Sequence, residues 1–300
     1  MAVRRLRLDA ELVRRGLARS REHAARLISE GRVTVAGSLA HKPATGVSTD
    51  AAVVVKERAD DPDYASRGAH KLVGALEHFG RSGLTVAGRR CLDAGASTGG
   101  FTDVLLRAGA AQVYAVDVGY GQLIWRLRQD ERVVVRDRTN VRELTLPVVD
   151  DVPVDLVVAD LSFISLRLVL PSLVAIAAPD GDLVVMVKPQ FEVGKDRVGK
   201  GGVVRDPELR AWAVTQVADG AAAAGWGARD VVTSPLPGPS GNVEFFLWLQ
   251  RGAPQIAADT VLAEAQGTRA PAEGPPDPAP RAAPSERPPT MGAPDERVGT

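Results

Sequence analysis

The sequence predicts an α/β protein with a doubly wound sheet of seven strands, preceded by a small α+β domain. Between residues 67 and 251 short apolar runs alternate with helix-like stretches, which is typical of a parallel sheet covered by helices. One of these runs leads directly into a glycine-rich turn and a helix, as in Rossmann-like folds. Residues 1–58 differ in charge: they hold 12 Lys and Arg against 6 Asp and Glu, whereas the 300-residue chain holds 37 of each.

The overall composition excludes several classes of protein. No run approaches the roughly 20 apolar residues of a membrane-spanning helix, and the start of the chain has no apolar core of signal-peptide length. We therefore expect a cytoplasmic protein. The single cysteine, Cys91, excludes an internal disulfide framework and a multi-cysteine zinc site. The four histidines are scattered, so no metal site is expected.

The first 58 residues predict two short helices packed on a small sheet. Asp9 is placed to cap a helix that Gly16 ends, and Ser20 is placed to cap a helix that Gly31 ends. Short strands are expected at residues 33–35 and 53–55.

The helix pair carries a cluster of arginines, so this domain is a candidate for binding a polyanion. The spacing LDaeLvrrGlarSRehAarLIseGrVtVaG resembles the RNA-binding module named after the fourth protein of the small ribosomal subunit, over roughly residues 6–56. That resemblance implies RNA binding, and the alternative is a solvated arginine face. The candidate RNA-binding residues are Arg4, Arg14, Arg15, Arg19, Arg21 and Arg26.

Two segments are predicted to lie outside the folded domains. Residues 59–66 continue an acidic stretch and contain Pro62, which is typical of a linker. Nine of the last thirty residues are proline, and no aromatic residue follows Trp248. Such a segment buries too little apolar surface to offset its ordering entropy, so residues 252–300 are expected to be disordered.

The body between these segments contains seven predicted strands, and the last two are expected to pair antiparallel at a sheet edge. The strands are expected at residues 90–93, 113–117, 133–136, 154–160, 182–188, 230–233 and 243–249. The clearest helices are expected at residues 72–79, 100–108 and 208–224.

The first strand of the body leads into CLDAGASTGGFTDVLL, a glycine loop at the start of a helix. Its spacing is G-x-x-x-G-G, and Asp93 lies immediately ahead of it, where an acid repels phosphate but suits an ammonium group. The second strand ends in Asp117, 22 residues after Gly95, and an acid there accepts hydrogen bonds from ribose hydroxyls.

Ammonium and ribose without phosphate describe S-adenosylmethionine, so this compound is the expected cofactor. Asn140, after the third strand, is a candidate partner for the adenine edge, and Asp137 is a weaker one. A nicotinamide site and a tight turn with incidental acids are the alternatives. The expected cofactor-binding residues are Asp93, Gly95, Ser97, Gly99, Gly100, Phe101, Asp117 and Asn140.

Two further strands end in a charged residue, Asp160 in one and Lys188 in the other. Ligands of open α/β sheets bind outside the carboxyl ends of the strands, so both residues are expected near the cofactor. Lys71 lies on the helix before the first strand of the body, and Glu244 lies in the last strand. The chain has 31 Arg and only 6 Lys, yet two of those lysines belong to this set. Lysine can release a proton where arginine cannot.

These four residues fit methyl transfer to a ribose hydroxyl. A 2′-hydroxyl is a poor nucleophile until its proton is accepted, and Lys188, crowded by Lys71, is the candidate general base. Asp160 is expected to orient the Lys188 amine, and Glu244 to help place the hydroxyl. Each residue also has a structural alternative: a helix surface for Lys71, a loop cap for Asp160, and for Glu244 an edge-strand charge that discourages aggregation.

The Lys71, Asp160, Lys188 and Glu244 set resembles the Lys-Asp-Lys-Glu tetrad of FtsJ-like ribose 2′-O-methyltransferases. Joined to the basic domain, it resembles the TlyA family, also called haemolysin A. The resemblance lies in SRGAHKL, LDAGASTGGFTDVLL, DVGYGQL, ADLSFISL, VKPQFEVGK and SPLPGPSGNVEFFLWL. It implies S-adenosylmethionine-dependent 2′-O-methylation of cytidine in 16S and 23S rRNA on ribosomal subunits, without a membrane partner.

Three other functions remain as alternatives: a pseudouridine synthase, a non-catalytic factor that binds rRNA, and a true haemolysin. The last has no long apolar or amphipathic segment to support it. Two further features are hypotheses. Phe163 either stacks on a base extruded from rRNA or belongs to the core, and the basic, glycine-rich loop 193–206 either contacts phosphates or is merely solvated.

Overall fold

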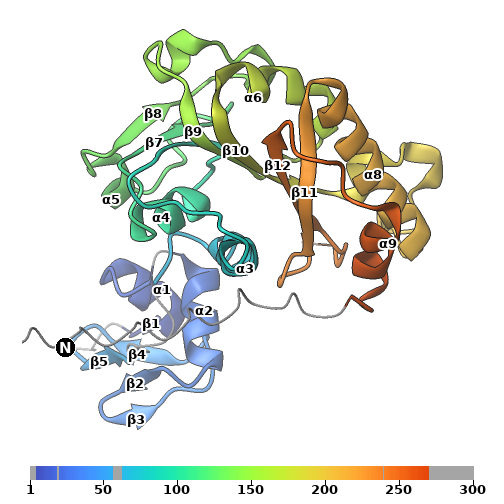
Figure 1. Cartoon of the computed structure of the whole chain (residues 1–300). Coiled ribbons are helices and arrows are strands. Elements are labelled where there is room, and N and C mark those ends of the chain that lie inside the picture. The colour runs from blue at the N-terminus through green and yellow to red at the C-terminus, as the bar shows by residue number, and fades with distance from the viewer. Residues whose placement is uncertain (1–4, 19, 57–62, 239, 270–300) are drawn as a thin grey trace, which may run out of the picture. The chain divides into compact units, whose positions relative to one another are not determined.

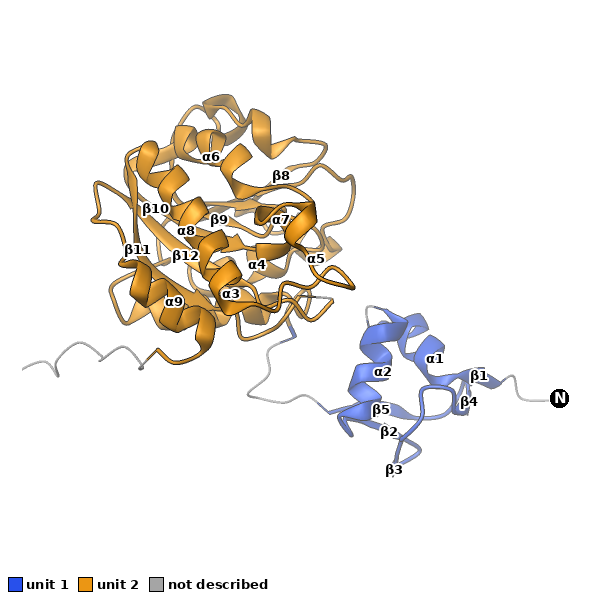
Figure 2. Cartoon of the chain, turned by 90° about the vertical axis from the view of Figure 1, so that its right-hand side faces the viewer, with its two compact units in different colours: residues 1–63 blue, residues 64–300 orange. Residues whose placement is uncertain are grey.

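The computed structural model describes residues 5–18, 20–56, 63–238 and 240–269. The chain divides into two compact units, residues 1–63 and 64–300, which are distinguished by colour in Figure 2.

The first unit packs two helices against short antiparallel strands. Its core consists of apolar residues from the helices and from the strands that face them, such as Leu8, Leu12, Leu27, Ile28 and Val33. Strand β1 pairs with β4, and a second sheet has the order β3-β2-β5. The elements are β1 (Arg5–Arg7), α1 (Leu8–Arg14), α2 (Arg21–Ser29), β2 (Val33–Val35), β3 (Ser38–Leu39), β4 (Gly46–Ser48) and β5 (Val53–Val55).

One of the two expected helix caps is present. The Ser20 hydroxyl accepts a hydrogen bond from the His23 amide at 3.1 Å and caps α2. The expectation that Asp9 caps α1 is wrong, because the helix already begins at Leu8 and its N-cap, Arg7, makes no side-chain cap bond. Asp9 instead accepts hydrogen bonds from the guanidinium groups of Arg7 and Arg21.

The second unit is built on a seven-stranded sheet with the order β11-β12-β10-β9-β6-β7-β8, which confirms the predicted fold class. Strands β6 to β10 run parallel, while β12 lies antiparallel between β10 and β11 at the edge. The strands are β6 (Arg90–Ala94), β7 (Gln112–Val116), β8 (Val133–Arg136), β9 (Val154–Ala159), β10 (Ala177–Val187), β11 (Trp226–Thr233) and β12 (Phe245–Arg251).

Helices cover both faces of this sheet, as Figure 1 shows. One face packs against α3 (Ala69–Gly80), α4 (Gly100–Arg107) and α5 (Trp125–Arg128). The other packs against α6 (Leu170–Ile176), α8 (Pro207–Ala223) and α9 (Ala258–Gln266). The short elements are α7 (Pro189–Glu192) and the 3-10 turns η1 (Val141–Glu143), η2 (Leu146–Val149), η3 (Leu166–Leu168) and η4 (Lys195–Arg197). Because both faces are covered, the central strands are apolar almost throughout.

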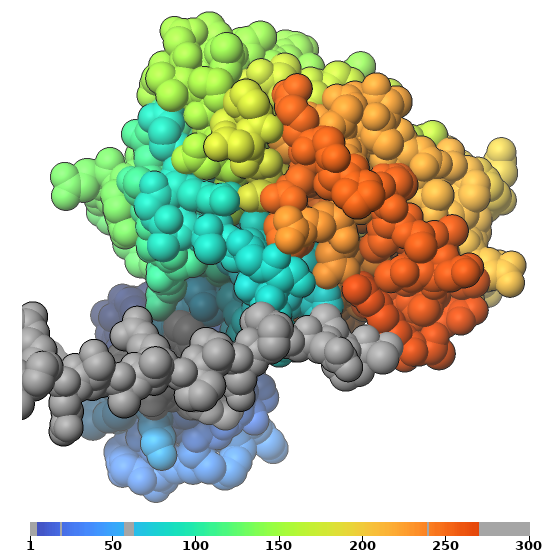
Figure 3. All heavy atoms as spheres, in the orientation of Figure 1, coloured from blue at the N-terminus to red at the C-terminus, as the bar shows by residue number. Residues whose placement is uncertain are grey.

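Helix α9 contradicts the prediction that the chain is disordered from residue 252 onward. Val261 and Ala265 are buried against the core below α8, and the space-filling view shows the deep orange of α9 lying against the lighter orange of α8 (Figure 3). The high proline content that suggested disorder begins only after this helix. The rest of the predicted tail, from residue 270, lies outside the described residues.

The end of the predicted linker also belongs to the second unit. Ala65 is buried, and its amide donates to the Asp103 carboxylate of α4 at 2.8 Å. The guanidinium of Arg107 lies 4.9 Å from the Tyr64 ring centroid. Residues 64–66 are therefore packed, and residues 57–62 lie outside the described part of the chain. No helix in the described ranges is long and apolar enough to span a bilayer.

Candidate active site

The glycine loop lies where the connections of the sheet change direction. Strand β6 pairs with β7 on one side and with β9 on the other, so the chain leaves it toward one edge of the sheet and later returns to build the other. The carboxyl ends of β6 and β9 are adjacent there, which is where ligands of doubly wound folds bind. The Asp160 amide donates to the Ala94 carbonyl at 3.1 Å, and this bond holds the two strand ends together.

Two glycines of the loop are required by close packing against protein. Gly95 has φ +87°, and a Cβ there would lie 2.7 Å from the Asp160 carbonyl oxygen. Gly99 has φ +100°, and a Cβ there would overlap the side chains of Leu123 and Leu127. Glycine is therefore needed at both positions, as expected. The reason is close contact with other residues of the protein, and no ligand is needed to explain it.

A cavity of about 250 Å³ lies over this loop. Of the expected cofactor-binding residues it is lined by Gly95, Ser97, Gly100 and Phe101, and Asp160 also lines it. A Cβ on Gly100 would overlap the Ser66 hydroxyl, which lies directly at the start of α4. Helix α4 and its glycine loop thus form the floor of the cavity.

Asp93 lies behind the loop and does not line the cavity. Its Oδ2 accepts a hydrogen bond from the Thr102 hydroxyl at 2.7 Å, while its Oδ1 is buried without a partner in the described part of the chain. Burial raises the pKa of Asp93 to about 7, and the charges of Asp160 and Asp117 act in the same direction. Three carboxylates therefore gather around one loop.

The other two expected cofactor contacts have clear local roles. Asp117 accepts hydrogen bonds from the amides of Ser97 at 2.8 Å and Gly119 at 2.7 Å, so it ties the end of β7 to the glycine loop. Asn140 is exposed, and its side chain caps η1 by accepting from the Arg142 amide. Asp137 accepts a hydrogen bond from Arg128 at 3.0 Å.

The four residues of the predicted tetrad come together as two ion pairs. Lys188 follows β10, and its Nζ lies 2.6 Å from Asp160 Oδ1 at the end of β9. The same ammonium donates to the Ser162 hydroxyl at 2.9 Å. Lys71 of α3 lies 2.5 Å from Glu244 Oε2. Each lysine is thus compensated by its own carboxylate, whereas the sequence suggested two lysines crowding one another.

Both lysines and Glu244 are buried, so three charged side chains have been removed from water at this edge of the sheet. Isolated buried charges are costly, and pairing offsets part of that cost. A Cβ on Gly238 would lie 2.5 Å from Glu244 Oε1, so the loop before β12 has room for the carboxylate only because this residue is glycine.

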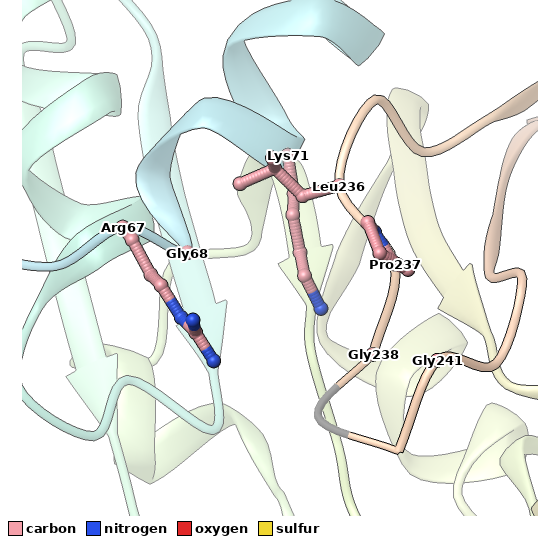
Figure 4. A pocket seen from close by; sticks show the side chains of 7 residues that line it. All are labelled: Arg67, Gly68, Lys71, Leu236, Pro237, Gly238 and Gly241. Atoms are coloured by element: carbon pink, nitrogen blue, oxygen red, sulfur yellow. The ribbon is translucent and has the colours of Figure 1, made fainter.

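A second cavity, of about 430 Å³, lies beside Lys71. Figure 4 shows the side chains of Arg67 and Lys71 extending into it, with Leu236 and Pro237 on the opposite side. Arg67 and Gly68 line this cavity and also the one over the glycine loop. A small molecule over the loop and a larger substrate beside Lys71 would therefore meet at these residues.

Comparison with known proteins agrees with this arrangement. Residues 64–251 match the model for FtsJ-like methyltransferases, and residues 6–53 match the S4 domain. The chain is 60% identical to the 16S/23S rRNA (cytidine-2′-O)-methyltransferase TlyA of Mycobacterium tuberculosis, over 91% of this chain and 99% of that protein.

The chain belongs to the TlyA family of FtsJ-like methyltransferases. Another relative is Hemolysin A of Brachyspira hyodysenteriae, 36% identical over 80% of this chain and 98% of that protein. A solved structure of a candidate hemolysin from Streptococcus thermophilus superposes with a TM-score of 0.67 at 35% identity, over 89% of this chain and 98% of that one. The protein is therefore a methyltransferase.

In this TlyA family member, several of the candidate RNA-binding arginines make ion pairs within the first unit. Arg14 and Arg15 bind Glu11 at 2.6 Å, and hydrogen bonding to Arg14 and then Arg15 lowers the pKa of Glu11 to about 2. Arg15 also donates to the backbone carbonyls of Ala51 and Thr49, so its guanidinium is fully engaged. Arg21 and Arg26 pair with acids but remain partly exposed. Arg4 and Arg19 lie outside the described residues.

Phe163 is 92% exposed, which excludes the alternative that it belongs to the core. It has φ +65°, and its ring lies 5.3 Å from that of Phe191. In the loop 193–206, Arg197 stacks on Trp212 at 4.0 Å, so one of its four basic side chains is held in place.

Sequence reasoning missed four polar residues that the fold brings to the TlyA-family site. Ser66 and Arg67 line the cavities, Ser162 accepts a hydrogen bond from Lys188, and Gln190 donates to Glu244 Oε1 at 3.4 Å. Each is adjacent in sequence to a predicted catalytic residue or lies within a few residues of one, and that proximity was the available signal.

In the described ranges no group of three or more His, Cys, Asp or Glu side chains is arranged to hold a metal ion. Burial raises the pKa of Cys91 to about 12, so this thiol is chemically inert.

Proposed function

We propose that this protein transfers a methyl group from S-adenosylmethionine to the 2′-hydroxyl of cytidine in 16S and 23S rRNA, within ribosomal subunits. The observation that carries the proposal is the paired tetrad, in which Lys188 lies against Asp160 and Lys71 against Glu244, beside two cavities that share Arg67 and Gly68. The substrate is that named for the TlyA relative, which is similar over nearly the whole of its length.

The charges around the glycine loop favour this cofactor. The carboxylates of Asp117 and Asp160, joined by Asp93 once it is ionised above its raised pKa of about 7, suit a ligand with an ammonium and a sulfonium group and disfavour a pyrophosphate. The Oδ1 of Asp93 is buried behind the loop without a hydrogen-bond partner among the described residues, so Asp93 would act on such a cation through its charge and not by direct contact. When bound, S-adenosylmethionine supplies an electrophilic methyl group. Gly95, Ser97, Gly100 and Phe101 would form its floor, with Gly99 shaping the loop, and Asp117 and Asn140 are the candidates for its ribose and adenine.

Lys188 is the proposed general base, and it can accept the hydroxyl proton only after its ammonium has released its own proton to solvent. Asp160 and Ser162 fix its amine in one position, and a positioned base is what raises the rate of proton transfer from a weakly acidic hydroxyl. Lys71 and Glu244 would orient the ribose from the adjoining cavity. The pairing with carboxylates keeps the buried lysines in place until RNA displaces water from the site.

RNA recognition is divided between the two units in this proposal. The exposed arginines of the first unit, such as Arg21 and Arg26, would bind phosphates. Phe163, exposed beside the tetrad, would stack on a base that has left its helix, because exposed aromatic side chains are the groups on which proteins stack unpaired RNA bases. The basic loop 193–206 is a candidate for neighbouring phosphates.

Transfer of tritiated methyl groups to isolated 30S and 50S subunits, followed by mapping of the ribose-methylated nucleotides, tests the proposal. We expect label at cytidine 2′-oxygens in both subunits. RNA binding without any transfer would contradict it and would favour a non-catalytic rRNA-binding factor. Lysis of cells by the purified protein would instead favour the haemolysin alternative.

A further inference from the structure

We propose that Glu192 is a positioning residue, whose buried carboxylate holds the loop of residues 160–166 against the turn that follows Lys188. This inference rests on the proposed function, because the loop carries Asp160, Ser162 and Phe163. Glu192 lines neither of the two cavities described above and is therefore expected to act through these residues.

The carboxylate makes two short contacts with the end of the loop. Its Oε2 accepts a hydrogen bond from the Ser165 hydroxyl at 2.6 Å, and its Oε1 accepts one from the Leu166 amide at 2.7 Å. The nearest cation is Arg167, whose Nε lies 3.6 Å from Oε2, and the Glu192 side chain is only 1% exposed. Burying a carboxylate is costly, and an apolar side chain would be less so if packing were the only requirement. Burial accordingly raises the pKa of Glu192.

The spacing of the contacts indicates that they form one clamp. Lys188 is the N-cap of α7, and Phe191 and Glu192 are the last two residues of this helix, so one short turn carries all three. Lys188 contacts Asp160 and Ser162, Phe191 contacts the Phe163 ring, and Glu192 contacts Ser165 and Leu166. The turn of residues 188–192, which carries the proposed base, thus contacts the loop of residues 160–166 at several positions from one end to the other.

The conformation of the loop explains why a clamp is needed. Phe163 is 92% exposed and has φ +65°, a left-handed conformation that is unfavourable for a bulky residue. A loop with an exposed aromatic ring and an unfavourable backbone would otherwise relax. Without Glu192, the described contacts of Lys188 with Asp160 and Ser162 and the ring contact of Phe163 would remain, but the carboxylate would no longer hold the end of the loop at Ser165 and Leu166.

Steady-state methyl transfer with the full-length variants Glu192→Gln and Ser165→Ala tests the clamp. We expect kcat to fall by about tenfold to a hundredfold in each, because small displacements of reacting groups have effects of this size. The KM for S-adenosylmethionine should stay within about twofold, since the glycine loop forms no part of the clamp. The double variant should lose little more than either single variant, because both remove the same interaction.

Asp182→Asn is the matched control. Asp182 is a buried carboxylate at the start of the paired part of β10 and accepts hydrogen bonds from Arg89, Trp248 and Gln250, roughly 20 Å along the strand from Lys188. We expect this variant to lower thermal stability but leave kcat within about twofold. The clamp would be refuted if Glu192→Gln also lowered thermal stability but left kcat within about twofold. It would likewise be refuted if the decreases in kcat of Glu192→Gln and Ser165→Ala multiplied in the double variant.

A Lys188→Arg variant measured in parallel separates this inference from the proposed function. Absence of methyl transfer in the wild-type protein would overturn the proposed function, whereas activity retained in Lys188→Arg would overturn the role of Lys188 as general base, on which the clamp depends. Loss of activity there together with normal kcat in both Glu192→Gln and Ser165→Ala would overturn the clamp alone.

Discussion

Individual charged side chains decide what this site can do. Lys188 and Lys71 are two of only six lysines in a chain with 31 arginines, and both are buried against carboxylates. Arginine would satisfy the same ion pairs but holds its proton at every accessible pH. The use of lysine at these two buried positions therefore indicates that the site needs a group that can release a proton, and not only a positive charge.

Replacement of the proposed base tests this directly. Lys188→Arg keeps the charge and a donor for Asp160, so RNA binding and the melting temperature should change little. Methyl transfer should fall at least a hundredfold, because the guanidinium cannot accept the hydroxyl proton. The measurement is tritium incorporation into subunits at saturating RNA, and transfer within tenfold of the wild-type rate would contradict the assignment.

The pKa of Asp93 leads to a prediction about stability. With a pKa of about 7 in the folded protein and an ordinary value of 3.8, the folded state holds a proton that the unfolded chain releases between pH 4 and 7. Raising the pH through this window therefore favours unfolding, by up to about 4 kcal/mol. Above about pH 8 the free energy of unfolding should no longer change through this group, because Asp93 is then ionised in the folded and the unfolded protein alike.

Asp93→Asn should remove this dependence, because an amide has no proton to lose. The difference in melting temperature between Asp93→Asn and the wild type should grow in favour of the variant from pH 5 to pH 7 and stay constant beyond pH 8. Thermal unfolding across that range measures it, and a difference independent of pH would show that Asp93 does not titrate there.

At the scale of the elements, α9 completes the core of the second unit. The helix lies against α8 and β11, and Glu264 accepts a hydrogen bond from the Thr233 amide at 2.6 Å. A segment that reads as a polar, alanine-rich tail thus provides two buried side chains, Val261 and Ala265, to the sheet face. Two apolar positions one turn apart are too weak a pattern to predict a helix without knowing the surface it covers.

Val261→Ala tests the contribution of α9. The substitution leaves a cavity at a position that is 2% exposed, so the free energy of unfolding should fall by roughly 2 kcal/mol. Gln266→Ala, on the exposed side of the same helix, should change it by less than about 0.5 kcal/mol. Denaturant unfolding of both proteins measures these values, and equal effects would show that α9 is not docked in solution.

At the scale of the whole molecule, the zero net charge conceals a basic first unit attached to a body without excess positive charge. Most of the described arginines of α1 and α2 are paired with Asp9, Glu11 or Glu30, yet Arg21 keeps 60% and Arg26 38% of its side chain exposed. The Arg26–Glu30 pair is partly exposed and contributes little to stability, and the buried Asp9 keeps Arg7 as a partner when Arg21 leaves it. Both guanidinium groups can therefore exchange a carboxylate for a phosphate at small cost.

The double variant Arg21→Gln and Arg26→Gln should therefore weaken rRNA binding with little loss of stability. Each lost phosphate contact should reduce the slope of log K against log salt concentration by about 0.7 to 0.9. Arg132→Gln, an exposed and paired arginine of the second unit, is the control and should leave the slope unchanged. Binding measured by fluorescence anisotropy at several salt concentrations decides between one, two or no lost contacts.

The seven-stranded α/β fold, the glycine loop and the four candidate residues of the tetrad could be predicted from the sequence alone. Each depends on local information: apolar periodicity, a turn that needs glycine, or a charged residue that closes an apolar strand. The folded structure was needed to show which lysine pairs with which acid and that Asp93 is fully buried. It was also needed to show that Ser162 contacts Lys188 and that Glu192 contacts the end of the same loop. These facts depend on contacts between segments far apart in the chain, and side-chain burial and pairing are set by how such segments pack, which no single segment encodes.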